Sequence, residues 1–294
     1  MLAGIEAGGT KFICAVGAGP GDLETVQIPT TTPVETVAKA VNFLRSFRAE
    51  MRAVGIAAFG PVDLHPASRT YGYITTTPKA GWHNFDLAGT VREALDLPVG
   101  FDTDVNAAAL GEARWGAAQG LTDFLYLTVG TGIGGGALVN GRLVHGLVHP
   151  EMGHIRVPRD KAEDPFSGCC PFHGDCLEGI AAGPAIRARW GMDAREFPVD
   201  HPGLLLEARY LALGLANWVC TLSPQRIVMG GGVIEQPLLL PLMRKELLRI
   251  LNGYVQAREL TERPEQYVVP AMLGSRAGVL GALVLAEEAS ERSS

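Results

Sequence analysis

The sequence lacks long hydrophobic runs and any concentration of basic residues. None of its apolar stretches reaches eighteen uninterrupted residues, and its N-terminal segment lacks the basic, apolar and small-residue regions of a signal peptide. Its 25 Lys and Arg residues are outnumbered by 31 Asp and Glu residues, for a net charge of -6. A membrane span is therefore not expected, and neither is the electrostatic attraction that drives nucleic-acid binding. We expect a soluble, cytoplasmic protein.

Cysteine is also scarce, with 5 in 294 residues, which argues against a disulfide framework. Cys14 and Cys220 each lie within apolar sequence, so we expect both to be buried as small hydrophobic side chains. The other three cysteines, Cys169, Cys170 and Cys176, are crowded into one short segment. Only this cluster needs a chemical explanation.

The cluster has the spacing of a metal site. Cys170, His173 and Cys176 form a C-x2-H-x2-C pattern, and His154 lies upstream, so four side chains could converge on one tetrahedral zinc ion. Cys169 could replace Cys170, but Cys170 has the symmetric spacing and is our choice. A loop of free thiols without metal is the alternative interpretation. Four protein ligands would make the zinc site closed and structural.

Strand and helix patterns alternate along the chain, which indicates an α/β protein. Residues 2–16 read as strand, glycine turn and strand, and residues 124–144 repeat this design before a hairpin turn at Asn140-Gly141. Helical spacing follows Thr32 and Glu35, which resemble a capping box. Further helices are expected at about 86–95, 105–116, 204–222 and 277–289, and further strands at 53–59, 99–102 and 225–229.

The two glycine turns suggest a polyphosphate ligand. A tight turn with Thr at its tip leaves backbone N–H groups and a hydroxyl free to bind phosphate oxygens. Such turns occur at residues 8–11 and 130–132, and a third glycine run at 230–232 could accept a nucleotide base or ribose, or simply enter a helix. Each turn alone is weak evidence, because most glycine hairpins are plain turns. Neither a Walker motif nor a G-x-G-x-x-G opening a helix is found.

Five motifs, in this order, resemble the ROK family of sugar kinases, repressors and related proteins. They are Glu6-Ala-Gly-Gly-Thr-Lys11, Asp102-Thr-Asp104-Val-Asn106-Ala-Ala-Ala-Leu-Gly-Glu112, Thr128-Val-Gly-Thr-Gly-Ile-Gly-Gly-Gly136, Pro150-Glu-Met-Gly-His154, and the Cys/His loop ending in Cys176-Leu-Glu178. The first motif and the Cys/His loop are most similar to the bacterial fructokinase branch. The match runs from residue 4 to about residue 281.

The resemblance implies the two-lobed, ribonuclease H-like α/β fold of actin, hexokinase and Hsp70-type ATPases, with ATP in an interdomain cleft. Residues 1–118 would form a small N-terminal lobe, completed by a C-terminal helix at about 278–294. Residues 119–277 would form a large lobe with the zinc loop. A homodimer is expected from the same resemblance. Family repressors carry a DNA-binding segment before the first glycine loop, which starts here at residue 6, so we expect a kinase and not a repressor.

Asp104 is the predicted general base, which would contact the sugar and accept the proton of its hydroxyl. Its alternative role is a helix cap, and Asp102 is a second, lower-ranked candidate for the base. By family match, Glu151, His154 and Glu178 would bind the sugar hydroxyls, with His154 also contacting zinc.

The resemblance also implies that ATP binds with Mg2+. The residues expected at the phosphates are Gly8, Gly9, Thr10, Lys11, Thr131 and Gly132, and those beside the adenosine are Pro184, Gly231 and Gly232. Glu6 stands where the family usually has Asp. Pro171 occupies the middle cysteine position of the family's zinc loop, so His173 would substitute; an ungapped match favours Cys169 as the first ligand and the fructokinase-like form favours Cys170. Trp82 could line the cleft, although core packing is favoured.

The predicted activity is ATP-dependent phosphorylation of a hexose, with fructose converted to fructose 6-phosphate as the leading reaction. Glucose, mannose and N-acetylmannosamine are the alternative acceptors within the family. A sugar sensor without catalytic activity is the alternative from another class; against it stands the combination of Asp104 with both phosphate loops.

Overall fold

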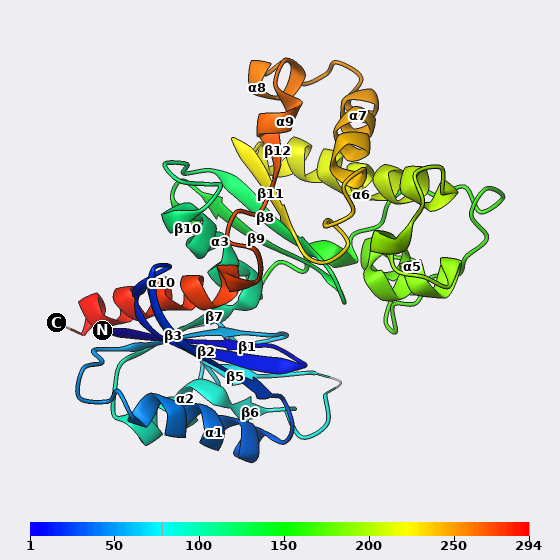
Figure 1. Ribbon diagram of the computed structural model, residues 1–294. Helices are drawn as coiled ribbons and strands as arrows, with labels where there is room; N and C mark the ends of the chain where they lie inside the picture. The colour runs from blue at the N-terminus through cyan, green and yellow to red at the C-terminus, as the bar shows by residue number, and fades with distance from the viewer. Residues whose placement is uncertain (78, 294) are drawn as a thin grey trace. The chain divides into compact units, whose positions relative to one another are not determined.

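The computed structural model describes residues 1–77 and 79–293 and divides into two compact units (Figure 1). Unit 1 comprises Met1–Gln119, Leu143–Pro150 and Ser275–Ser294, and unit 2 comprises Gly120–Arg142 and Glu151–Gly274. The segment Leu143–Pro150 therefore belongs to unit 1, whereas the predicted boundaries place it in the larger lobe.

The main sheet of unit 1 has the strand order β3-β2-β1-β4-β7. β1 pairs antiparallel with β2, which pairs antiparallel with β3, while β4 and β7 continue the sheet in parallel. The strands are β1 Leu2–Ala7, β2 Lys11–Gly19, β3 Asp22–Pro29, β4 Val54–Ala58 and β7 Val99–Thr103, with a separate small pair β5 Tyr73–Ile74 and β6 Phe85–Asp86. The mostly apolar and buried sequences of β1 and β4 fit their central, covered positions.

Helices cover both faces of this sheet (Figure 1). α1 and α2 pack together on one face, and α10 packs with α3 on the other, where α10 also contacts β1, β4 and β7. The helices are α1 Pro33–Arg45, α2 Leu87–Leu95, α3 Asp104–Trp115 and α10 Ala277–Arg292.

Glycines on the sheet let α10 approach the backbone of the strands. A Cβ built at Gly55 of β4 would lie 1.7 Å from the carbonyl oxygen of Ala282, and one at Gly4 of β1 would lie 2.8 Å from that of Val279. Any larger residue at Gly55 would force the helix away from the sheet. The predicted C-terminal helix is confirmed, and its packing on the N-terminal strands is built into the sequence.

The start of α1 shows how local sequence sets an element. Thr32 caps the helix by accepting a hydrogen bond from the N–H of Glu35, and Pro33 occupies the first turn. The Glu35 carboxylate accepts hydrogen bonds from Thr31 and Lys39, so only half of the predicted capping box forms.

The core of unit 1 surrounds Trp82, which is completely buried. Its ring contacts Phe12, Phe59 and Phe85 at centroid distances of 5.4 to 5.6 Å, and its Nε1–H donates to the carbonyl of Thr31 at 2.9 Å. Core packing is therefore the role of Trp82, as favoured from the sequence.

The sheet of unit 2 repeats the opening arrangement, with the strand order β10-β9-β8-β11-β12. β8 and β9 form an antiparallel hairpin, and β11 and β12 run parallel to β8. The strands are β8 Phe124–Val129, β9 Ile133–Val139, β10 Arg142–Leu143, β11 Arg226–Gly230 and β12 Val268–Pro270. Asn140 and Gly141 have positive φ angles of 53° and 72°, so the predicted hairpin turn is confirmed.

The helices of unit 2 are led by α6, a 21-residue helix that confirms the predicted long buried segment. The helices are α4 Leu177–Ala181, α5 Gly183–Trp190, α6 Pro202–Leu222, α7 Leu239–Leu251, α8 Arg258–Thr261 and α9 Pro264–Tyr267, with short 3-10 turns at Met152–His154 and Ala194–Glu196. A further 3-10 turn, Gly274–Arg276, lies where the chain passes from unit 2 to unit 1. Among the described helices, none combines the length and apolar character needed to cross a membrane.

One prediction about cysteine burial is wrong. Cys14 is completely buried in β2, but Cys220 is exposed near the end of α6. Its neighbours Trp218 and Val219 are buried, and each residue turns the helix by about 100°, so an apolar sequence context does not by itself bury every position.

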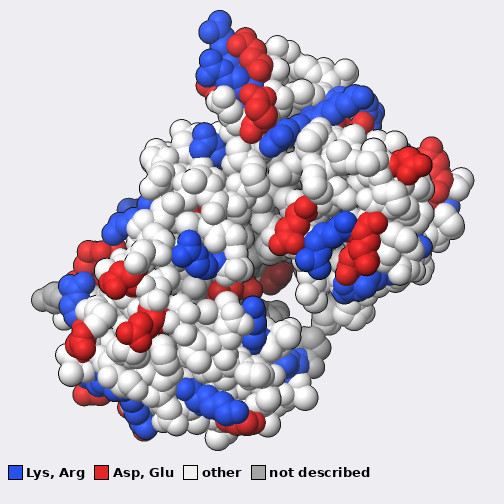
Figure 2. Space-filling model, in the orientation of Figure 1, with Lys and Arg blue, Asp and Glu red and all other residues white. Residues whose placement is uncertain are grey.

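On the face in Figure 2, acidic and basic side chains are interspersed.

Candidate active site and metal-binding loop

The first glycine turn, between β1 and β2, is closed by backbone hydrogen bonds. The N–H of Gly8 donates to the carbonyl of Lys11 at 3.0 Å, and the Thr30 hydroxyl donates to the carbonyl of Gly8 at 2.7 Å. A Cβ at Gly8 would lie 2.7 Å from the Lys11 carbonyl oxygen, so this position requires glycine. Gly9, Thr10 and Lys11 are exposed at the tip, where backbone N–H groups and the lysine ammonium can meet an anion.

Glu6 lies beneath this turn and is electrostatically linked to Asp104. The pKa of Glu6 is raised from 4.5 to about 7, chiefly by burial and also by the nearby Asp104 charge, while Lys11 and a hydrogen bond from the Val279 N–H act in the opposite direction. A Cβ at Gly278 would lie 2.6 Å from the Glu6 carboxyl carbon, so this carboxyl group is packed against the first turn of α10. Unit 1 thus brings the first glycine turn, Glu6 and Asp104 together.

Thr103, and not Asp104, caps helix α3. The Thr103 hydroxyl accepts a hydrogen bond from the N–H of Asn106 at 3.2 Å, and Asp104 is the first residue inside the helix. Asp104 accepts a hydrogen bond from the Val105 N–H at 2.9 Å through one oxygen. The alternative interpretation of Asp104 as the cap of this helix is therefore wrong.

Asp102 is buried in a hydrogen-bond network of its own. One carboxylate oxygen accepts from the Thr103 N–H and from the Asn106 side chain, both at 2.7 Å, and the other lies 2.8 Å from His145 Nε2. The hydrogen bond with Asp102 raises the pKa of His145, which favours the charged imidazolium. The pair joins segment 143–150 to the end of β7, within unit 1. Sequence reasoning missed His145 because nothing in the neighbouring sequence marks it as a partner of Asp102.

The second and third glycine turns lie together in unit 2. Gly130 closes the β8–β9 turn by donating to the Gly132 carbonyl at 2.9 Å, and its own carbonyl accepts from the N–H of Gly183 at 2.8 Å. Gly231 has a φ angle of +90° and packs against the backbone of Val129, at the end of β8. The end of β8 is thus surrounded by residues that were predicted to contact the nucleotide, namely Thr131, Gly132, Pro184, Gly231 and Gly232.

Glu151, His154 and Glu178 also come together in unit 2. Burial raises the pKa of Glu151, His154 lowers it and Glu178 raises it, which places the three groups within electrostatic reach of one another. His154 Nε2 lies 3.9 Å from one Glu178 oxygen, and the other Glu178 oxygen accepts a hydrogen bond from the Ile133 N–H at 3.0 Å. This arrangement can present two carboxylates and an imidazole to a polyhydroxylated ligand.

The Cys/His cluster has the dimensions of a tetrahedral zinc site. The ligand atoms of His154, Cys170, His173 and Cys176 all lie within 4.8 Å of one another. The distances from His154 Nδ1 to Cys176 Sγ, Cys170 Sγ and His173 Nδ1 are 3.4, 3.7 and 3.3 Å. Ligands bound to tetrahedral zinc lie roughly 3.3–3.8 Å apart, so these residues fit the ion. Cys169 is exposed and outside the group.

A buried charge network anchors the segment that precedes this loop. Asp164 accepts hydrogen bonds from Arg159, Arg189 and Tyr210 at 2.7 to 3.2 Å. Arg159 also bonds Asp175 in the Cys/His loop of residues 169–176, named the metal loop below. The side chains of Arg159 and Asp164 are only 5% and 3% exposed, so the carboxylate and the guanidinium satisfy each other away from water. Sequence reasoning missed this network, because charged loop residues carry no pattern that predicts burial.

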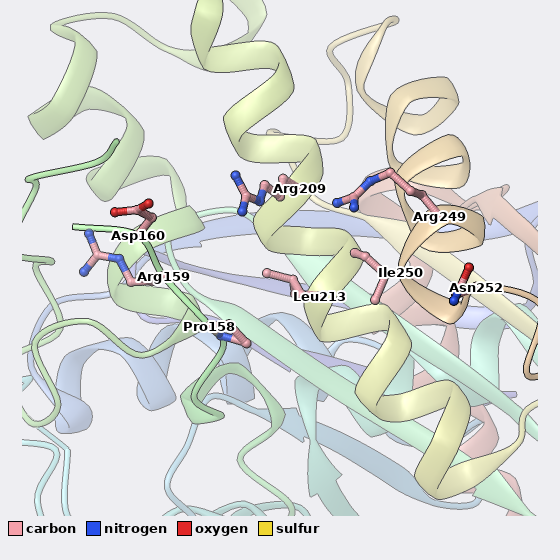
Figure 3. Close-up of a pocket in the computed structure, with 8 residues that line it drawn as sticks. All are labelled: Pro158, Arg159, Asp160, Arg209, Leu213, Arg249, Ile250 and Asn252. Carbon is pink, nitrogen blue, oxygen red and sulfur yellow. The ribbon is translucent and has the colours of Figure 1, made fainter. Parts of the chain in front are cut away.

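A hollow of about 710 Å³ in unit 2 is lined in part by Arg159 (Figure 3). Arg209 from α6 and Arg249 from α7 face it, together with the segment that begins at Pro158. None of the residues predicted from the sequence as site residues lines it. We therefore assign the candidate chemistry to the glycine turns and the metal loop.

Comparisons with known proteins identify the family of the chain and its fold. The model of the ROK family matches residues 2–289. A fructokinase from Lactococcus lactis subsp. cremoris is 43% identical over 284 residues, which cover 96% of this chain and 95% of that protein. The crystal structure of a ROK hexokinase from Thermus thermophilus is 32% identical with a TM-score of 0.79, covering 99% of both chains. A ROK glucokinase from Streptomyces griseus, solved with glucose and AMPPNP, is 29% identical with a TM-score of 0.73, covering 98% of this chain and 99% of that one. The predicted family resemblance and fold class are confirmed.

Proposed function

We propose, since the chain belongs to the ROK family, that it is a kinase that transfers the γ-phosphate of ATP to a hexose hydroxyl, with fructose as the preferred acceptor and fructose 6-phosphate as the product. The observation that carries the choice of fructose is the 43% identity to a fructokinase over nearly the whole of both chains, against 29% to a glucokinase.

Asp104 is proposed to act as the general base. The hydroxyl oxygen attacks the γ-phosphorus, the bond to the bridging oxygen of ADP breaks, and the hydroxyl proton passes to the Asp104 carboxylate. Two observations support Asp104 over Asp102: Thr103 performs the capping, and Asp102 is buried with His145 and Asn106 on its oxygens.

The glycine turns are proposed to hold ATP. These turns would offer backbone N–H groups, hydroxyls and one ammonium group to the phosphates, from Gly8, Gly9, Thr10, Lys11, Thr131 and Gly132. Pro184, Gly231 and Gly232 would border the adenosine. ATP binds with Mg2+, which neutralises charge on the phosphates during transfer.

The sugar is proposed to bind to Glu151, His154 and Glu178 as well as Asp104. Carboxylate and imidazole groups that are partly withdrawn from water discriminate strongly against an analogue that lacks a matching hydroxyl. His154 would orient the sugar with one side of its ring, while its Nδ1 atom lies 3.3 to 3.7 Å from the other three ligand atoms of the metal group.

The metal group is proposed to hold a structural zinc ion through His154, Cys170, His173 and Cys176. When bound, the ion supplies folding energy to its loop. The family resemblance further leads us to propose that the protein is a homodimer located in the cytoplasm. Light scattering by the purified protein would give its mass and so test the oligomeric state.

The test is ATP-dependent phosphorylation by purified protein of fructose, mannose, glucose and N-acetylmannosamine, with Asp104→Asn as the control variant. We expect the highest kcat/KM on fructose and a loss of about a hundredfold or more in the variant. Higher turnover on another sugar would retain the kinase and reject fructose. Failure on all four sugars would reject the kinase and favour a sugar sensor.

A further inference from the structure

Glu178 is bonded to the glycine turn that is proposed to hold ATP phosphates. It lies in the first turn of α4, two residues after Cys176, and its Oε2 accepts the Ile133 N–H at 3.0 Å. A Cβ at Gly132 would lie 2.6 Å from the same oxygen. The carboxylate therefore fills the space beneath Gly132, and its position sets that of the turn.

The segments on either side of Glu178 hold the same turn at two more points. The Gly183 N–H donates to the Gly130 carbonyl at 2.8 Å. A Cβ at Gly153, next to His154, would lie 1.9 Å from the Ile133 carbonyl oxygen, so the 3-10 turn packs directly on the end of the loop. Three backbone groups of the turn thus rest on the segments that carry metal ligands or follow them.

The metal loop in turn sets the position of α4. A Cβ at Gly179 would lie 2.0 Å from the Gly174 carbonyl oxygen and 2.9 Å from Cys170 Cβ, so the loop and α4 are in backbone contact. A histidine that binds metal through Nδ1 carries its proton on Nε2. In His154 this N–H would face Glu178 Oε1, 3.9 Å away, and attract the carboxylate into the place it occupies.

We infer that Glu178 is a positioning residue for the turn Gly130–Ile133, and that it couples the occupancy of the metal site to the affinity for nucleotide. This inference rests on the proposed function, because it assigns the turn to ATP. Coupling between two sites is reciprocal, so nucleotide should also tighten the hold on the metal.

The first experiment measures the binding of AMPPNP with Mg2+ by isothermal titration calorimetry without sugar, so that a role of Glu178 in sugar binding does not enter. We expect Glu178→Ala to weaken binding about tenfold. Glu178→Gln should restore most of the affinity, because its amide oxygen can still accept the Ile133 N–H. Glu163→Gln is the control: it is an exposed carboxylate in the segment before the Cys/His cluster, paired with Arg209, and it should leave nucleotide affinity within about twofold of wild type.

The second experiment removes the metal with a chelator selective for zinc over magnesium and repeats the titration. Wild type should lose affinity and Glu178→Ala should lose little more, since its link is already broken. Hydrogen exchange of the peptide spanning residues 127–139 gives a readout without any ligand and should accelerate in both the metal-depleted wild type and Glu178→Ala, with thermal unfolding confirming that the variant is folded.

Two results would overturn the inference: unchanged nucleotide affinity in Glu178→Ala, or equal losses in Glu178→Ala and Glu163→Gln. If the affinity for AMPPNP is normal and is changed neither by Glu178→Ala nor by the chelator, the coupling is rejected and the proposed function is retained. Absence of AMPPNP binding by the metal-loaded wild type would reject the proposed function, and unchanged hydrogen exchange in that case would reject the positioning role as well.

Discussion

The two glycine turns are similar in sequence and differ in what supports them. The turn after β1 is held by its own sheet: Gly8 bonds Lys11 across the turn, and Thr30 of the segment after β3 bonds both sides of it. These partners lie within 22 residues. The first turn therefore forms as soon as three adjacent strands pair.

The turn after β8 depends on distant residues. Ile133 is bonded to a carboxylate 45 positions further along the chain, and Gly130 is bonded to Gly183. The elements that carry these partners are short, and α4 has only 5 residues, too few to be stable alone. A hairpin of the same design can thus be supported by local strand pairing in one place and by residues 45 or more positions away in another.

The largest expected effect is that of losing the metal, which should loosen the second turn and leave the first turn unchanged. Cys176→Ser should abolish stoichiometric zinc and lower Tm by roughly 5–10 °C, because a buried ligand is lost from a closed site. Metal analysis and calorimetry measure both quantities. In hydrogen exchange, amides of residues 127–139 should accelerate while those of residues 5–13 stay unchanged.

Cys169→Ser is the matched control for that variant, because Cys169 is exposed and outside the metal group. It should retain zinc and wild-type Tm. Loss of zinc in Cys169→Ser together with its retention in Cys176→Ser would contradict the proposed ligand set.

An effect of intermediate size concerns pH and the first turn only. The pKa of Glu6 is about 7 in the folded protein against 4.5 ordinarily, chiefly through burial. Between these values the unfolded chain loses the proton and the folded chain keeps it, so Glu6 costs stability as pH rises through this window, by about 3 kcal/mol at most. Glu6→Gln removes this cost, and its stability relative to wild type should increase from pH 5 to pH 8 in denaturant unfolding. Parallel curves for the two proteins would refute the role of Glu6.

The smallest effect compares alanine at the two turns. A Cβ at Gly8 meets the Lys11 backbone, which cannot move aside, so Gly8→Ala should cost about 1–3 kcal/mol of unfolding free energy. At Gly132 the obstacle is the end of the Glu178 side chain, which can rotate, so Gly132→Ala should cost less. Gly21→Ala, which meets nothing within 4 Å, is the control and should be nearly neutral. Equal costs at Gly8 and Gly132 would remove the distinction between the turns.

Much of the fold follows from local sequence. The two hairpins, the long helix α6 and the positive φ angles at Asn140-Gly141 were all predictable, because period, turn chemistry and capping act between residues close in the chain. The order and spacing of the motifs also predicted the family and fold class, which the comparisons confirm.

Contacts across long sequence separations were not predictable. The side chains of His145 and Asp102 are in contact although they lie 43 positions apart, and those of Arg189 and Asp164 although they lie 25 positions apart. No rule of sequence spacing predicts either pair. The exposure of Cys220 shows the same limit, because the buried face of α6 depends on which other elements pack against the helix, and the local sequence does not predict these elements. Glu178 shows both the success and the limit of prediction. Its motif could be recognised in the sequence, but its hydrogen bond with Ile133 could not be predicted.

The close packing of α10 on Gly4 and Gly55 also bears on how the protein is synthesised. The ribosome makes β1, β4 and β7 early and α10 last, after all of unit 2. Throughout that interval one face of the first sheet has no helix α10 to cover it, whereas residues of unit 2 are all available for folding before α10 emerges. Unit 2 should therefore be the first part of the nascent chain to reach its native state, and chaperones that bind exposed apolar strands should act on the N-terminal sheet until translation ends.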